Sequence, residues 1–124
     1  GIASRGLGDV YKRQLYNYDS YSVFFGDALV GYIISKISYP ETHILNLTVS
    51  TQFRNNGIGG SLIQLIINDA RIRNSQDIIL EVRSSNKIAQ SLYKKLLFKQ
   101  IGVRKGYYDC HEGREDAYVL KLEL

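Results

Sequence analysis

The stretch that decides the fold runs from Ile44 to Ala70 and reads I-L-N-L-T-V-S-T-Q-F-R-N-N-G-I-G-G-S-L-I-Q-L-I-I-N-D-A. Its first six residues, ending at Val49, are mostly apolar, which is typical of a strand covered on both faces of a sheet. After a short polar turn, apolar residues recur at helical spacing; they are Ile58, Leu62, Leu65 and Ile66. The stretch therefore predicts a central strand, a turn and an amphipathic helix.

Three glycines, Gly57, Gly59 and Gly60, lie where this helix is expected to begin. A helix start without side chains leaves its N–H groups accessible and presents the positive end of the helix dipole, which favours phosphate binding. Two common phosphate motifs do not fit. The P-loop needs a Lys-Ser or Lys-Thr pair after the glycines, and the dinucleotide motif needs G-x-G-x-x-G spacing and a second half-fold. A glycine-rich connection without a ligand remains the alternative.

The hexapeptide R-N-N-G-I-G, from Arg54 to Gly59, resembles the [Q/R]-x-x-G-x-[G/A] signature of the GCN5-related N-acetyltransferases. In that family this loop and helix hold the pyrophosphate of acetyl-coenzyme A. The resemblance implies that acetyl-CoA is the cofactor. It implies coenzyme contacts from the preceding strand and from the loop and helix start, namely Leu47, Val49, Arg54, Asn55, Asn56, Gly57, Ile58, Gly59, Gly60 and Ser61.

Two further segments resemble the same family. D-I-I-L-E-V-R-S-S-N-K-I-A-Q-S-L-Y-K-K-L-L-F resembles its L-x-L-E-V-R-x-S-N-x-x-A-x-x-L-Y-x-x-x-G-F segment, with Leu97 in place of the usual glycine, which should strain the turn after the helix. The tail V-R-K-G-Y-Y-D-C-H-E-G-R-E-D-A-Y-V-L resembles the ending of the RimI type, with Asp109 where proline is common. RimI-type enzymes acetylate the N-terminal alanine of a small-subunit ribosomal protein. The resemblance extends from about Tyr18 to the C-terminus.

The implied reaction moves an acetyl group to a peptide α-amine, whose pKa of ~8 means that it must lose a proton before attack. Glu81 is the candidate base, directly or through a water, because it ends an apolar strand where partial burial suits that role. The alternative is a solvated carboxylate paired with Arg83 or Lys87. Backbone N–H groups from Leu47 to Val49 are candidate oxyanion donors, provided that their strand parts from its neighbour.

The remaining candidate residues surround the acyl group and the acceptor. Tyr93 resembles the family's general acid and coenzyme contact, although a core aromatic on a helix would look the same. Asn86 should cap that helix and contact the coenzyme. Tyr107 and Tyr108 are expected to flank the acceptor amine, or else to pack as strand-edge aromatics. Residues 114–116 fit the family ending but also fit a solvated hairpin. His43, His111 and Cys110 have no convincing partner set, so we predict no metal site and no Cys-His nucleophile.

The first residues look foreign. D-V-Y-K-R-Q, from Asp9 to Gln14, is what GAT-GTG-TAT-AAG-AGA-CAG encodes, and that string resembles a transposon mosaic-end adaptor. We therefore predict that residues 1–14 are an adaptor-derived, non-native segment that packs poorly, and that residues 15–124 are a truncated acetyltransferase domain. A buried strand through Val10 and Tyr11 would contradict this. The alternative is a genuine basic arm. The segment carries Arg5, Lys12 and Arg13 against Asp9, and hence half of the formal charge of +4.

The rest of the chain reads as strands with two helices. Strands are expected at 21–25, 28–37, 44–49 and 77–82 and in a terminal hairpin at 99–107 and 117–124, and helices at 59–73 and 86–96. This order predicts an α/β mixed sheet with helices on both faces. The resemblance implies the family fold without its first strand and first two helices. Coenzyme features should then persist while acceptor selectivity is compromised.

Length and composition set the remaining expectations. With 124 residues and one cysteine, the chain should be one domain without an internal disulfide. No signal peptide or long apolar span is visible, so we expect a cytoplasmic monomer with no membrane or nucleic-acid partner. Its partner would be a protein N-terminus. Two other functions stay open: a transferase acting on a small amine or a lysine, and a non-catalytic module that binds acetyl-CoA.

Overall fold

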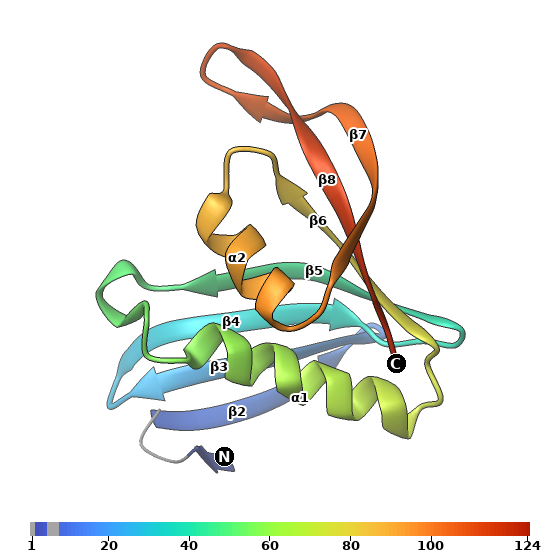
Figure 1. Ribbon diagram of the computed structural model, residues 1–124. Helices are drawn as coiled ribbons and strands as arrows, with labels where there is room; N and C mark the ends of the chain where they lie inside the picture. Colours follow the sequence, from blue (N-terminus) through green and yellow to red (C-terminus); the bar gives the residue numbers. More distant parts are fainter. Residues whose placement is uncertain (1, 5–7) are drawn as a thin grey trace.

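The computed structural model describes residues 2–4 and 8–124, with side chains from residue 8 onward. These residues form one mixed sheet whose strands lie side by side in the order β1-β2-β3-β4-β5-β6-β8-β7, together with two α-helices (Figure 1). The elements are β1 (Ile2–Ser4), β2 (Gly8–Leu15), β3 (Tyr18–Phe25), β4 (Ala28–Lys36), β5 (Glu41–Val49), the 3-10 helix η1 (Thr51–Phe53), α1 (Ile58–Ile72), β6 (Asp77–Arg83), α2 (Lys87–Lys95), β7 (Lys99–Cys110) and β8 (Gly113–Glu123).

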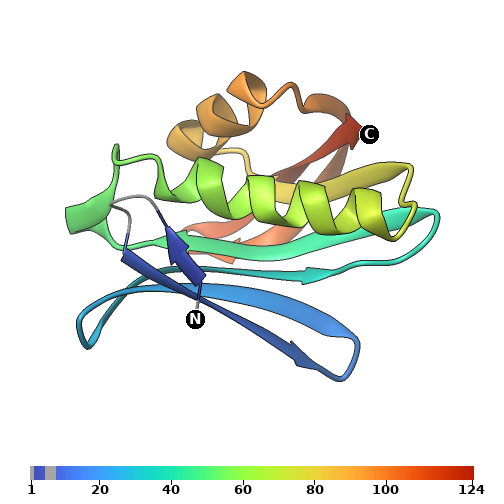
Figure 2. The ribbon, with the colours of Figure 1, turned by 90° about the horizontal axis from the view of Figure 1, so that it is seen from below.

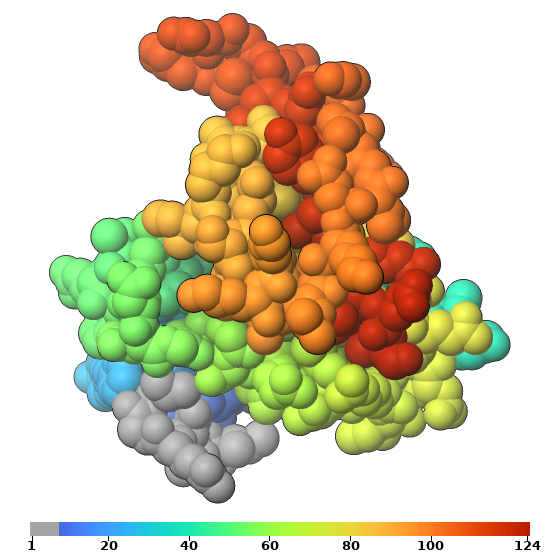
Figure 3. Space-filling view, viewed as in Figure 1, coloured from blue at the N-terminus to red at the C-terminus, as the bar shows by residue number. Residues whose placement is uncertain are grey.

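Every strand and helix predicted from residue 21 onward is present, and the largest difference lies in the terminal hairpin. There β7 extends to Cys110 and β8 begins at Gly113, four residues before the predicted start. The hairpin projects beyond the rest of the molecule (Figures 1 and 3). Neither helix in the part of the chain that the structure describes has the length and apolar character needed to cross a membrane.

Only one pair of neighbouring strands, β5 and β6, is parallel among the described pairings, and it is short. Its register runs from Glu41 opposite Asp77 to Ile44 opposite Leu80. Beyond that point β5 continues to Val49 and β6 to Arg83, but the two strands no longer pair with each other. The parting of two neighbouring strands, on which the candidate oxyanion donors depend, is therefore present.

Both helices lie on the same face of the sheet (Figure 2), so the expectation of helices on both faces is wrong for the described residues. The buried side of α1 packs on β4 and β5 through Ile58, Leu62, Ile63, Ile66, Ile67 and Ala70. The start of α1 also touches α2, because a Cβ on Gly59 would lie only 3.0 Å from Leu92 Cδ2. The Leu92 side chain thus packs closely over the backbone of Gly59.

Each helix is followed by a residue in the left-handed region, and the next residue donates a backbone hydrogen bond to the last turn of the helix. After α1, Asn74 has φ 61°, and Ser75 N–H donates to Ala70 O at 2.9 Å. After α2, Leu97 has φ 72°, and Phe98 N–H donates to Tyr93 O at 3.0 Å. Glycine is the usual residue at this position because it has no Cβ to clash. The predicted strain at Leu97 is confirmed, since a leucine occupies the left-handed region there.

The strand β2 contradicts the expectation that residues 1–14 pack poorly. It pairs with β3 from Asp9 opposite Phe24 to Leu15 opposite Tyr18, and Val10 is 4% exposed while Tyr11 is 47% exposed. The expected absence of a strand before β3 is therefore wrong as well. Residues 1 and 5–7 lie outside the described part, and strand packing does not bear on where the coding sequence came from.

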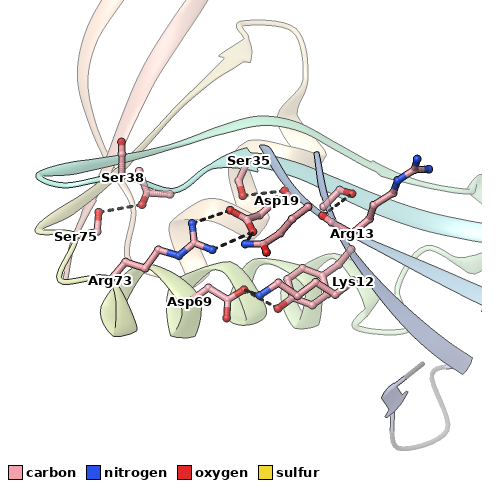
Figure 4. Close-up of polar contacts among 12 residues, drawn as sticks. Lys12, Arg13, Asp19, Ser35, Ser38, Asp69, Arg73 and Ser75 are labelled. Atoms are coloured by element: carbon pink, nitrogen blue, oxygen red, sulfur yellow. Dashed lines mark hydrogen bonds and ion pairs between the residues drawn. The ribbon is translucent and has the colours of Figure 1, made fainter. Parts of the chain in front are cut away.

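A polar network ties β2 and β3 to α1 (Figure 4). Lys12 Nζ lies 3.1 Å from Asp69 Oδ2, and Tyr21 donates its hydroxyl proton to the same carboxylate oxygen at 2.6 Å. Arg73 donates to both oxygens of the buried Asp19 at 3.0 and 3.1 Å. The inward face of β2 is therefore largely polar and is matched by carboxylates on its neighbours.

Candidate active site

The start of α1 has several backbone N–H groups without a protein acceptor. Gly57 is the N-cap residue with φ 76°, no side chain caps the helix, and the first turn contains no acidic residue. Within the described chain, the N–H groups from Asn55 to Gly60 donate to no protein acceptor, whereas Ser61 N–H donates to Gly57 O at 3.0 Å. Free donors at the positive end of a helix dipole fit a diphosphate. Ser61 retains only its hydroxyl for that purpose.

The exposed edge of β5 supplies a second set of donors. Ser50 N–H donates to Val30 O at 2.8 Å, and the register places Thr48 opposite Tyr32. Because hydrogen-bonding residues alternate along an antiparallel pair, the N–H groups of Leu47 and Val49 point to the other edge of β5. That is the edge from which β6 has departed. These two donors therefore face the wedge between the strands, as predicted.

Glu81 lies on β6 just beyond the last paired residue, on the face opposite the helices, since its neighbours Leu80 and Val82 are in the core. Its side chain is 11% exposed, with Oε2 2.8 Å from His43 Nε2 and Oε1 3.8 Å from Arg104 Nε. The alternative expectation, that Glu81 pairs with Arg83 or Lys87, is wrong. Arg83 pairs with Glu115, and Lys87 lies near the ring of Tyr118. Glu81 is thus a shielded carboxylate at the mouth of the wedge.

His43 is the residue that the sequence analysis missed. In the parallel register it lies opposite Ile79, so Glu81 is two residues farther along the same face of the neighbouring strand. Side chains two residues apart on a strand point the same way. The pairing of His43 with Glu81 can therefore be predicted once the β5–β6 register is known, but not from the separate motifs.

Tyr93 is a core aromatic whose hydroxyl is still accessible. The residue is 6% exposed and its ring packs against Phe98 with centroids 5.7 Å apart. The hydroxyl has no hydrogen-bond partner among the described residues, yet it is not sealed from solvent. Burial, with a smaller contribution from Tyr108, raises the pKa of Tyr93 to about 12. It therefore keeps its proton at neutral pH, as a core aromatic and a proton donor would both require.

The two tyrosines of β7 stand beside Glu81. Tyr107 and Tyr108 meet edge to face with ring centroids 5.0 Å apart, Arg104 lies over the first ring at 5.1 Å, and Arg83 lies over the second at 4.4 Å. Burial raises the pKa of Tyr108, and the nearby charge of Glu81 raises it further. These rings are packed on charged neighbours rather than on the core.

Asn86 has the predicted capping role at α2, where its Oδ1 accepts a hydrogen bond from Ala89 N–H at 3.1 Å. A hollow of about 460 Å3 lies at the opposite end of α1 and is lined by residues 14–19, residues 36–38 and Arg73. It contains none of the predicted site residues. The guanidinium of Arg73, which lines this hollow, is already paired with Asp19.

The comparisons with known proteins agree with this geometry. The model of the Acetyltransferase (GNAT) family matches residues 5–98. The chain therefore belongs to the GNAT acetyltransferase family, whose members use acetyl-CoA.

Named relatives point to one branch of this family. The [ribosomal protein bS18]-alanine N-acetyltransferase of Salmonella typhimurium is 31% identical over 98 residues, covering 79% of this chain and 66% of the relative. That of Haemophilus ducreyi is 36% identical over 99 residues, covering 79% and 68%. The crystal structure of the ribosomal-protein-S18-alanine N-acetyltransferase from Escherichia coli is similar with a TM-score of 0.80 and 28% identity, covering 89% of this chain and 71% of that one. The chain thus spans about two thirds of the length of these curated relatives.

Proposed function

We propose that this chain transfers an acetyl group from acetyl-CoA to the α-amine at the N-terminus of a protein, with a ribosomal protein that begins with alanine as the acceptor. The observation that carries the proposal is the wedge between β5 and β6, which has free amides at the start of α1 on one side and Glu81 at its mouth. The relatives named above, which act on bS18, support the choice of acceptor. Because ribosomal proteins are made in the cytoplasm, we place the reaction there.

The start of α1 fits the coenzyme. The amides from Asn55 to Gly60 would hold the diphosphate, with Arg54 adding positive charge. Leu47, Val49, Asn86 and Tyr93 would hold the rest of the coenzyme along the wedge. Acetyl-CoA supplies an acetyl group that is activated as a thioester.

Glu81 takes the proton that the acceptor amine must lose. Its carboxylate is held by the N–H of His43 at Oε2 and by the charge of Arg104 near Oε1. This leaves Oε1 as the oxygen that receives a proton, directly or through a water. A base held in one orientation needs less rearrangement at the moment of reaction.

Tyr93 gives a proton to the leaving sulfur, while the amides of Leu47 and Val49 stabilise negative charge that develops on the carbonyl oxygen. With its pKa raised to about 12, the phenol is protonated at neutral pH. The leaving sulfur needs a donor that still carries its proton, and Tyr93 meets that requirement. Tyr107 and Tyr108 would flank the amine beside Glu81.

The double variant Glu81→Gln, Tyr93→Phe tests the assignment. We expect acceptor-dependent thiol release from acetyl-CoA to fall at least about a hundredfold with an alanine-initiated peptide, while calorimetry shows coenzyme A binding within about threefold of wild type. Glu112→Gln, which neutralises a carboxylate in the turn of the β7–β8 hairpin, is the matched control and should be as active as wild type.

Two results would overturn the proposal. One is turnover in the double variant equal to wild type. The other is thiol release from the wild-type chain that responds to a panel of small amines or to lysine side chains but not to peptide N-termini.

A further inference from the structure

The strand β7 contains a three-residue bulge that includes the first residue of its tyrosine pair. Arg104 lies opposite Ala117 and Tyr108 opposite Glu115, so three residues of β7, Lys105 to Tyr107, face one residue of β8. Gly106 has φ 57° at the centre of this bulge. A bulge turns the following side chains away from the direction that a regular strand would give them. The shape of this bulge therefore sets where Tyr107 and Tyr108 point.

Two residues of β8 hold the bulge by its backbone. Asp116 accepts a hydrogen bond from Gly106 N–H at 2.9 Å, and its other oxygen lies 3.2 Å from Lys105 Nζ. Arg114 donates to Gly106 O and, at 3.3 Å, to Tyr107 O. The hydrogen bond from Gly106 N–H lowers the pKa of Asp116, and the hydrogen bond from the Lys105 side chain lowers it further. One short segment of β8 thus satisfies the N–H of Gly106 and the carbonyl oxygens of Gly106 and Tyr107.

Glu115, the residue between Arg114 and Asp116, binds the arginine that lies over the ring of Tyr108. Its Oε1 accepts from Arg83 Nη1 at 2.8 Å, and its Oε2 accepts from Ser85 N–H at 3.3 Å. The same Arg83 nitrogen donates to Asp109 O at 2.9 Å, and the guanidinium lies over the Tyr108 ring. Glu115 therefore fixes the cation on which Tyr108 rests.

We infer that Arg114, Glu115 and Asp116 are positioning residues, a clamp that shapes the β7 bulge so that Tyr107 and Tyr108 stand beside Glu81 and receive the acceptor amine. This inference rests on the proposed function. A merely solvated hairpin would direct these three side chains to water, whereas all of them bond to the bulge or to the residue under Tyr108. Exposed ion pairs contribute little to global stability, so the clamp acts on local geometry.

The test compares two substitutions at Asp116 with a matched control. Asp116→Ala removes the acceptor for Gly106 N–H, and we expect the KM for an alanine-initiated peptide to rise roughly tenfold or more. Asp116→Asn keeps an oxygen for that N–H and should restore the KM to within about threefold of wild type. Lys105→Ala removes only the exposed ion-pair partner and should leave the KM unchanged. In all three variants the KM for acetyl-CoA and the melting temperature should stay near wild type.

The outcomes separate the clamp from the function on which it rests. If Asp116→Ala leaves the peptide KM within about twofold of wild type, or if Asp116→Asn is as impaired as Asp116→Ala, the clamp is refuted while the transferase remains. Equal increases in the KM values for peptide and acetyl-CoA would assign Asp116 a general structural role and also refute the clamp. A wild-type chain that releases no thiol in response to peptide overturns the proposed function and the clamp together.

Discussion

A carboxylate placed at Gly60 should stabilise the protein and at the same time weaken coenzyme binding. Gly60 is the third residue of α1, which has neither a side-chain cap nor an acidic residue in its first turn. A Cβ at this position would meet only Leu92 Cδ1, at 3.9 Å, which is an ordinary contact. An aspartate there can accept from the free N–H groups of the first turn and complements the helix dipole.

The two effects can be given magnitudes. Replacing glycine in a helix and adding a first-turn carboxylate should together raise the free energy of unfolding by about 1 kcal/mol. A diphosphate on the same amides would lie close to the new charge, and at an effective dielectric constant of ~20 two unit charges ~6 Å apart repel by about 3 kcal/mol. Binding of coenzyme A should therefore weaken at least about tenfold, and less at high salt.

Urea unfolding and calorimetric titration with coenzyme A measure the two quantities. Gly60→Asn is the matched neutral variant, and Gly60→Ala separates the effect of a Cβ from that of the charge. If Gly60→Asp binds coenzyme A as tightly as Gly60→Asn at low salt, the diphosphate does not rest on these amides. The assignment of the start of α1 would then be wrong, however stable the variant is.

Two further predictions concern the packing of β2 and the protonation of Tyr93. Val10→Ala should lower the free energy of unfolding by about 1–3 kcal/mol, because Val10 is 4% exposed. Leu15→Ala, on the exposed face of the same strand, should cost less than about 1 kcal/mol, and equal small losses would show that β2 does not pack in solution. Burial raises the pKa of Tyr93 to about 12, so as the pH rises the unfolded chain releases this proton first, near ~10, and the fold loses stability through pH 10 to 12. Urea unfolding of the wild-type chain should thus lose about 1.4 kcal/mol more than Tyr93→Phe between about pH 9 and about pH 11, and equal losses would contradict the shifted pKa.

The parts of the fold that could be predicted from the sequence are those encoded locally. The start and length of α1 follow from glycines and a helical apolar spacing within one segment, and Asn86 caps α2 through a contact only three residues away. Both features depend on neighbours in the chain. The parting of β5 from β6 was a condition for the candidate oxyanion donors and is not encoded in either strand alone.

Features that depend on the partner of a side chain were not predictable in this way. The inward face of β2 carries Lys12 and Gln14, which are matched by Asp69 and Asp19, so the strand does not show the usual apolar alternation. The pairing of His43 with Glu81 depends on the β5–β6 register.

The roles of residues 114–116 depend on a bulge in another strand, which no spacing within the G-R-E-D segment reveals. The contact between the two helices likewise joins Gly59 and Leu92, residues from different motifs.

The short β5–β6 pairing also determines where the molecule can bend. Four residue pairs join β5 to β6, whereas seven join β6 to β8. The sheet therefore consists of two parts, one of β1 to β5 and one of β6, β8 and β7, joined by this short pairing. A small rotation of one part relative to the other would widen or narrow the gap at Glu81. A ligand that spans the junction contacts both parts, so its arrival should stiffen the whole sheet along this one line.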